Sequence, residues 1–112
     1  MAVRSSQADV QRVLGDLQNA IRTNRFVFIN RTKNMATLSS LGLLMSDVRD
    51  VLMHLTFAEY TKGPETDRDQ PSSDPFWFFK KTVCGQVLYI KFKIEYQTDG
   101  KVKVVSFHID EP

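Results

Sequence analysis

With 112 residues, of which 42% are hydrophobic and 25% charged, and a formal net charge of +2 at pH 7, the chain is expected to form one domain, residues 1–112. Its one cysteine, Cys84, excludes an internal disulfide framework and a cysteine-based metal site, and no run of about eighteen apolar residues suggests a membrane span. We therefore expect a reduced, cytoplasmic setting, with neither export nor membrane insertion.

The first expected element is an amphipathic helix that begins after Ser6 and ends near Asn24. The sequence Ser6-Gln7-Ala8-Asp9 resembles a capping box, with Asp9 in the place of the usual glutamate or glutamine. The apolar positions that follow at helical spacing are Val10, Val13, Leu14, Leu17 and Ile21. This spacing predicts one apolar stripe along the helix.

A short strand and two further helices are expected next. Residues 26–29 are apolar at every position, which predicts a strand that is partly covered on each side. A short helix then ends at Gly42, and Ser46 caps a third helix. The apolar positions of these two helices are Met35, Leu38 and Leu41, followed by Val48, Val51, Leu52 and Leu55.

Residues 63–75 contain three prolines and no apolar periodicity, which predicts a mobile surface loop. Loops of this length are uncommon unless they are functional. Residues 76–83 then predict a strand that leads through Cys84 and Gly85 into the C-terminal hairpin.

The C-terminal hairpin has two chemically different faces. Residues 85–96 and 101–109 alternate with period two, and Asp99-Gly100 predicts a two-residue turn that pairs Thr98 with Lys101. This register predicts three apolar pairs on one face: Ile94 with Val105, Phe92 with Phe107, and Ile90 with Ile109. On the other face it predicts the pairs Lys93 with Ser106, Lys91 with His108, and Tyr89 with Asp110. Such an exposed patch of cations, a phenol and an imidazole suits a phosphodiester.

The order of these elements predicts an α+β domain, with a mostly antiparallel sheet of at least four strands and about three helices on its apolar face. Residues 17–46 and 75–94 are basic and contain no acidic residue, and an acidic segment separates them. If the two basic blocks meet in the fold, they attract a polyanion; otherwise their charges simply keep the domain soluble.

Four stretches resemble a known family: LTFAEYTKGP at 55–64, FW at 76–77, GQVLYIK at 85–91 and VVSFH at 104–108. They are similar to the MqsR family of bacterial type II toxins, and the likeness covers roughly residues 10–109. The resemblance implies a RelE-like fold, cleavage of messenger RNA, and a cognate antitoxin encoded by a neighbouring gene. It assigns catalytic roles to Lys62, Tyr89 and His108. This chain departs from the pattern in having His108 where a lysine is expected and Phe78 where a glutamine is expected.

Cleavage of RNA without a metal independently requires groups of these kinds. The 2′-hydroxyl must lose a proton, charge on the phosphate must be stabilised, and the 5′-oxygen must be protonated. His108 suits either proton transfer, and Tyr89 could orient or deprotonate the nucleophile if nearby lysines favour its anion. We expect RNA to contact Arg31, Lys33, Lys80, Lys91 and Lys93. No cofactor or metal is expected, because the histidines and the cysteine do not form a ligand cluster.

The competing prediction is an α+β module that binds RNA or a protein without catalysis, which Phe78 keeps open. A lysine-rich strand face can also serve only to discourage aggregation. We expect Phe76 and Trp77 to lie in the core rather than to stack on bases, and Cys84 to be a small packing residue. The part of the loop from Glu65 to Asp74 is expected to reorganise when an antitoxin binds.

Overall fold

The computed structural model describes residues 4–111, which fold into three α-helices, one 3-10 turn and a five-stranded sheet. In chain order the elements are α1 (Gln7–Arg22), β1 (Phe26–Phe28), α2 (Thr32–Leu41), α3 (Met45–Met53), the 3-10 turn η1 (Phe57–Glu59), β2 (Tyr60–Glu65), β3 (Phe76–Val83), β4 (Gln86–Ile94) and β5 (Val102–Ile109). The strand order is β1-β5-β4-β3-β2; β1 runs parallel to β5, and the other neighbours are antiparallel. The predicted α+β class is confirmed, and β2 adds a strand to the expected minimum of four.

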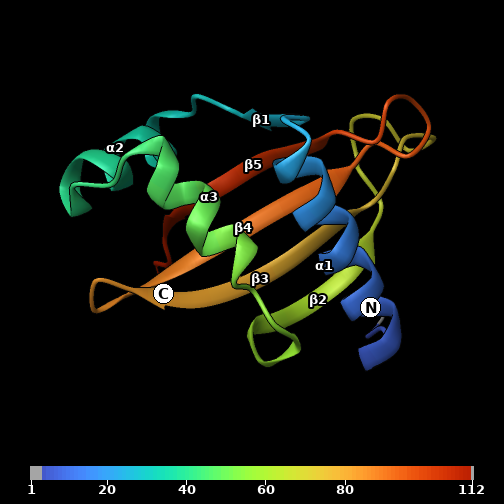
Figure 1. Ribbon diagram of the computed structural model, residues 1–112, viewed down its shortest axis with the longest axis horizontal. Coiled ribbons are helices and arrows are strands. Elements are labelled where there is room, and N and C mark those ends of the chain that lie inside the picture. The colour runs from blue at the N-terminus through green and yellow to red at the C-terminus, as the bar shows by residue number, and fades with distance from the viewer. Residues whose placement is uncertain (1–3, 112) are drawn as a thin grey trace.

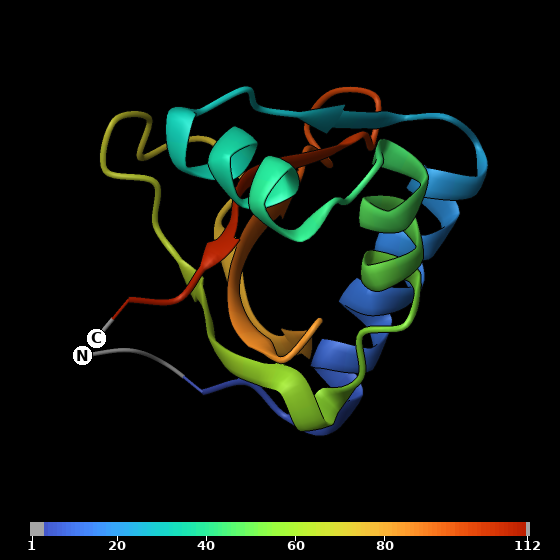
Figure 2. The ribbon, with the colours of Figure 1, turned by 90° about the vertical axis from the view of Figure 1, so that its left-hand side faces the viewer.

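The helices and the longest loop occupy opposite sides of the curved sheet. Figures 1 and 2 show α1 and α3 covering one face, while α2 lies beside the end of β5. The connection from β2 to β3 extends over the other face, away from α1 and α3 (Figure 2). None of the helices among residues 4–111 is long and apolar enough to cross a membrane.

The core lies between α1, α3 and the inner face of the sheet. Ser6 caps α1 by accepting a hydrogen bond from the Asp9 N–H at 3.2 Å, and the predicted apolar stripe of α1 is buried. Phe79 and Phe92 stack on the inner face of the sheet, with ring centroids 5.5 Å apart and both side chains fully buried. Trp77 is also buried, as predicted.

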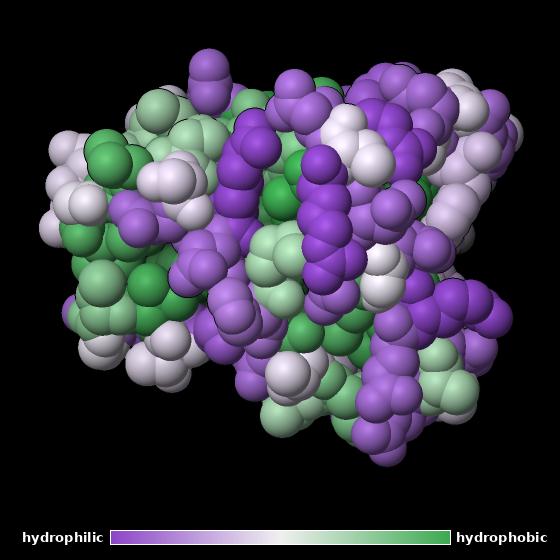
Figure 3. All heavy atoms as spheres, in the orientation of Figure 1, coloured by the Kyte–Doolittle hydropathy of each residue, from purple (hydrophilic) through white to green (hydrophobic). Residues whose placement is uncertain are grey.

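Some predicted boundaries of the early elements are wrong. Gly42 ends α2 in the left-handed conformation, as expected, but Ser46 lies within α3 rather than capping it. The chain enters α3 at Leu44, whose N–H donates to the Asp47 carboxylate at 2.8 Å. Leu44 is 69% exposed, and Met35 and Met45 are also exposed. Figure 3 shows apolar surface at its left, on the side where Figure 1 shows α2.

The strand predicted at residues 26–29 is shorter and less covered than expected. β1 ends at Phe28, and its central residue, Val27, is 37% exposed. The strand lies at one edge of the sheet, so its apolar sequence does not indicate burial on both faces.

The two-residue turn predicted between β4 and β5 is not formed there, and a tight turn joins β3 and β4 instead. Residues 95–101 form a longer connection between β4 and β5, in which the Glu95 N–H donates to the Lys101 carbonyl at 2.9 Å. The tight turn lies between β3 and β4, at Cys84 and Gly85, which have positive φ angles of 52° and 75°. Cys84 is therefore an exposed turn residue, and the prediction that it packs internally is wrong.

The predicted pairs between β4 and β5 are also wrong, although the outer face keeps its composition. Tyr89 lies opposite His108, and Lys91 lies opposite Ser106. Where residues 88–91 pair with residues 106–109, the register differs from the prediction by two residues, which leaves each side chain on the expected face. Beyond an irregularity at Val105 the register differs by three, so Lys103 lies opposite Lys93.

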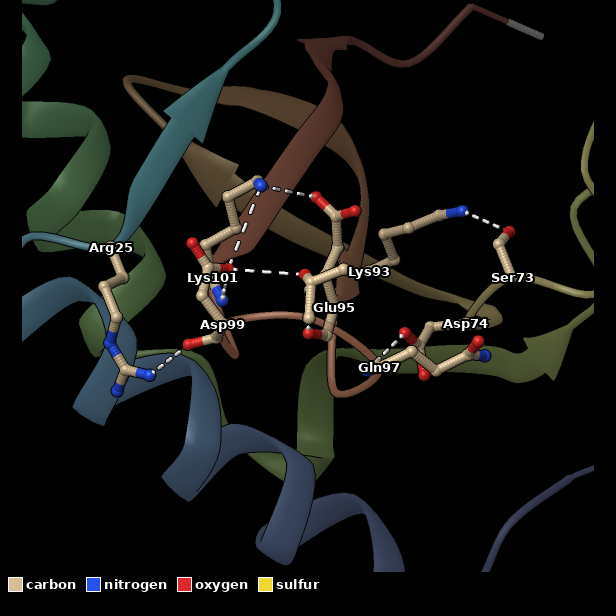
Figure 4. Close-up of polar contacts among 9 residues, drawn as sticks. Arg25, Ser73, Asp74, Lys93, Glu95, Gln97, Asp99 and Lys101 are labelled. Carbon is tan, nitrogen blue, oxygen red and sulfur yellow. Dashed lines mark hydrogen bonds and ion pairs between the residues drawn. The ribbon is translucent and has the colours of Figure 1, made fainter.

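The loop predicted at residues 63–75 is partly strand. Residues 63–65 belong to β2, and residues 66–75 connect β2 to β3. The connecting loop is anchored to the β4–β5 region by Gln97, whose N–H donates to the Asp74 carboxylate at 3.2 Å (Figure 4). The Gln97 side-chain amide donates to the Ser72 carbonyl at 3.0 Å.

Candidate functional site

The outer face of the sheet carries a cleft of about 660 Å³, on the side away from α1 and α3. Residues 65–70, which run from the end of β2 into the loop, form one wall, and Ile29 and Arg31 line it from the segment between β1 and α2. The strand residues that line it are Lys62, Phe76, Phe78, Tyr89, Lys91, Lys103 and Val105. The fold therefore brings the two basic blocks of the sequence together at one cleft.

The cleft has an aromatic floor with ammonium groups above it. The Phe78 and Tyr89 rings lie 6.1 Å apart, and Phe78 is only 2% exposed. The Lys62 Nζ lies 4.5 Å from the centroid of the Phe78 ring, and the Lys91 Nζ lies 4.3 Å from that of Phe76. A cation is attracted to the face of an aromatic ring, so these rings help to hold the two ammonium groups at the cleft.

The cleft shifts the pKa values of two of its side chains. Burial lowers the pKa of the Lys91 ammonium, and the positive charge of Arg31 lowers it further. Burial raises the pKa of the Tyr89 phenol, and this effect exceeds the opposing influence of Lys62. Nearby lysines favour the Tyr89 anion, but less than burial disfavours it, so the condition under which Tyr89 would deprotonate the nucleophile is not met. Tyr89 is a neutral phenol that can donate a hydrogen bond.

His108 lies beside the cleft. Its ring centroid is 5.4 Å from that of Tyr89, and the side chain is half-buried. The Nδ1 atom lies 3.0 Å from the Ile109 carbonyl oxygen, so a proton on Nδ1 is held by the backbone and Nε2 is left for other chemistry. His108 also lines a second cleft of about 230 Å³, together with Lys33 and Thr37. The imidazole therefore lies between the main cleft and the second cleft.

Lys62, the third predicted catalytic residue, comes from β2. Lys62 lies opposite Phe78 in the sheet. Phe78 is the residue that stands where the resemblance leads us to expect a glutamine. Its Nζ is 3.1 Å from a carboxylate oxygen of Glu65, which also lines the cleft. The ammonium is therefore available to an anionic ligand only in competition with a neighbouring acid.

The five residues predicted to contact RNA lie in different environments. Arg31 and Lys91 line the main cleft, and Arg31 donates to the Ser106 hydroxyl at 3.0 Å. Lys33 lines the second cleft. Lys80 lies opposite Tyr89 and forms an ion pair with Asp110 at 3.0 Å.

Lys93 is not on the exposed patch where the hairpin prediction placed it. Its side chain is 5% exposed, and its Nζ lies 2.8 Å from Asp67 and 3.0 Å from the Ser73 hydroxyl. Figure 4 shows Lys93 reaching from β4 toward Ser73 on the connecting loop. The hydrogen bond from Lys93 holds the pKa of the Asp67 carboxyl below its usual value. The positive charge of Lys93 is therefore balanced by Asp67, in an ion pair within the protein.

Sequence reasoning missed two contributors to the cleft. Lys103 lines it because the irregularity at Val105 turns this lysine to the outer face of β5. The wall formed by residues 65–70 was also missed, because nothing local in an acidic loop indicates which surface it will cover. The alternation of Lys101, Val102, Lys103 and Val104 was the available signal for Lys103.

The fold and this cleft define a small α+β protein with a basic, aromatic-floored cleft on the outer face of its sheet. Residues 11–109 match the model of a family described as "Motility quorum-sensing regulator, toxin of MqsA". The chain belongs to this MqsR toxin family, and it is thus a toxin of a toxin–antitoxin system with an antitoxin as its partner. A comparison with curated proteins gives no match.

Proposed function

We propose that this toxin is a metal-independent endoribonuclease that cleaves messenger RNA. The 2′-hydroxyl attacks the adjacent phosphorus, the bond to the 5′-oxygen breaks, and the products carry a 2′,3′-cyclic phosphate and a 5′-hydroxyl. The observation that carries this proposal is the convergence of Lys62, Tyr89 and Lys91 in one cleft, with His108 beside Tyr89.

Each group has a property that this reaction needs. The ammonium groups of Lys62 and Lys91 stabilise the negative charge that develops on the phosphate oxygens. Tyr89, as a neutral phenol, donates a hydrogen bond to one of these oxygens or to the nucleophile. The free Nε2 of His108 accepts the proton of the 2′-hydroxyl or delivers one to the 5′-oxygen.

Phe78 makes the cleft differ from the pattern that the resemblance implies. A phenylalanine ring offers the substrate no hydrogen bond, and here it supports the Lys62 ammonium instead. Arg31 and Lys103 supply further positive charge at the same cleft. We therefore propose that cations take over the part of phosphate binding that an amide would contribute.

Residues 65–70 border the cleft on one side, which gives the outer face of the sheet a groove rather than a flat surface. Proteins that recognise RNA by its bases take single strands, whose bases can be splayed out and held individually. The substrate we propose is a single-stranded segment whose phosphate lies near Lys62 and Lys91.

The decisive experiment incubates the purified toxin with a labelled single-stranded RNA in excess EDTA and analyses the product ends by mass spectrometry. We expect cleavage in EDTA with 2′,3′-cyclic phosphate ends. Replacing the imidazole in His108→Ala should lower the rate by about 10²-fold or more. Exposed His54, at the end of α3, offers a matched control, because His54→Ala removes an imidazole far from the cleft.

Other outcomes lead to different conclusions. Products with 5′-phosphate and 3′-hydroxyl ends would contradict attack by the 2′-hydroxyl. Tight RNA binding without cleavage by the unaltered protein would favour the non-catalytic binding module. Equal rates for the His108 and His54 variants would remove His108 from the mechanism.

A further inference from the structure

The segment of β5 that carries His108 is held along one edge by a helix. β1 ends at Phe28, and its pairing with β5 stops at Val104. Backbone groups of β5 beyond this point need other partners, because a buried N–H or C=O without a hydrogen bond is costly. Figure 1 shows α2 lying at this end of β5.

Asn34 of α2 supplies the first set of partners. Its Oδ1 accepts the Phe107 N–H at 2.9 Å, and its Nδ2 donates to the Val105 carbonyl at 3.0 Å. The same Nδ2 donates to the Ile29 carbonyl at 2.9 Å, which ties the segment after β1 to this point. Asn34 is fully buried, so these bonds are shielded from water.

Thr37 supplies the next partner, one turn along the same helix. Its Oγ1 accepts the Ile109 N–H at 3.0 Å, and the residue is 4% exposed. Positions three apart lie on one face of a helix, so Asn34 and Thr37 together bind alternate residues of the strand. We call this pair of side chains the α2 clamp.

The α2 clamp forms hydrogen bonds with the backbone of β5 on both sides of His108. The N–H groups that it binds belong to Phe107 and Ile109, the two chain neighbours of the imidazole. Asn34 also binds the carbonyl of Val105, where the register of β5 changes. A bulge leaves backbone groups outside the regular ladder, and a side chain that binds them fixes where the bulge lies.

We propose that Asn34 and Thr37 are positioning residues that set the location of His108 relative to Tyr89. This inference rests on the proposed ribonuclease function for its catalytic consequence, although the geometry itself does not depend on it. The pairing with β4 places His108 opposite Tyr89, and the clamp fixes the other edge of the same residues. Without the clamp, the last residues of β5 lose this second set of hydrogen bonds, and the position of the His108 ring relative to Tyr89 is held less precisely.

The test compares Thr37→Val, which keeps the shape of the side chain but removes its hydroxyl, with Thr37→Ser, which keeps the hydroxyl. Ser39→Ala, on the exposed side of the same helix, is the matched control. Because small misplacements of catalytic groups cost large factors in rate, we expect Thr37→Val to lower kcat about tenfold with KM nearly unchanged. Thr37→Ser should restore most of kcat.

A second readout follows the imidazole without relying on activity. In NMR spectra, the His108 ring protons sense the Tyr89 ring, whose centroid is 5.4 Å away. We expect these signals to move in Thr37→Val and to return in Thr37→Ser. If the unaltered protein does not cleave RNA, the proposed function fails, while this spectrum still decides whether the clamp positions His108.

Two results would overturn the proposal. If Thr37→Val retains both kcat and the His108 signals while its melting temperature falls, the clamp serves stability alone. Loss of kcat in Thr37→Val and Thr37→Ser alike would show that the accepted hydrogen bond is not the cause.

Discussion

Lys91 and Lys93 occupy the same face of β4, two residues apart, yet the structure predicts different contributions to RNA binding. Lys91 lines the cleft, whereas the charge of Lys93 is cancelled by Asp67 at 2.8 Å. We therefore compare Lys91→Met with the double variant Asp67→Asn/Lys93→Met. The double variant removes one positive and one negative charge, so the net charge of the protein does not change.

The expected magnitude follows from counterion release. For single strands, each neutralised phosphate contributes about 0.7 to the slope of log affinity against log salt concentration. Lys91→Met should reduce this slope by about 0.7, which means that raising the salt fourfold weakens the unaltered protein about 2.6-fold more than the variant. The double variant should keep the original slope.

The assay is fluorescence anisotropy of a labelled single-stranded oligonucleotide with 2′-O-methyl riboses, which has no free 2′-hydroxyl and resists cleavage. Affinities are measured across a series of salt concentrations, and circular dichroism verifies that both variants are folded. An equal loss of slope in the two variants would contradict the neutralisation of Lys93 by Asp67. An unchanged slope in Lys91→Met would show that Lys91 does not contact phosphate.

Three further predictions concern acid stability, the core and the phenol. The pKa of Asp67 is lower in the folded protein than in the unfolded chain. Its ionised carboxylate therefore stabilises the fold fully above the unfolded pKa of about 4, and this stabilisation is lost as the pH falls through the folded pKa. In urea unfolding at a series of acid pH values, Asp67→Asn should lose less stability on acidification than the unaltered protein. Phe79→Ala should lower the free energy of unfolding by about 3–5 kcal/mol, because it empties a fully buried site stacked on Phe92, and urea denaturation measures this directly. Tyr89→Phe should lower kcat for RNA cleavage by about 10²-fold through the loss of a hydrogen-bond donor. Since the Tyr89 pKa is raised, the pH–rate profile between about 6 and 9 should keep its shape in this variant, and a lost alkaline limb would contradict the neutral phenol.

The elements that could be predicted are those whose signals are local. The cap at Ser6 and the apolar stripe of α1, the stop of α2 at Gly42, and the strand at 76–83 all follow from side chains within a few positions of one another. The alternation of β4 likewise indicated that Tyr89 and Lys91 share a face. The family resemblance then directed attention to Lys62 and His108.

Pairing between distant segments was less predictable. Asp99-Gly100 and Cys84-Gly85 both precede a strand, and only the second forms the tight turn, because strand pairing in the rest of the sheet selects where each hairpin closes. The β4–β5 faces survived this mistake because the register near Tyr89 differs by an even number of residues.

The sequence by itself determined the class of fold, most helices and strands, and the kinds of side chain on the outer face, because periodicity and capping are local properties of the chain. Tertiary structure alone decided that Lys93 is neutralised by Asp67, that Lys103 joins the cleft, and that α2 holds the end of β5. These contacts join residues far apart in sequence, and which of them form depends on how the whole core packs.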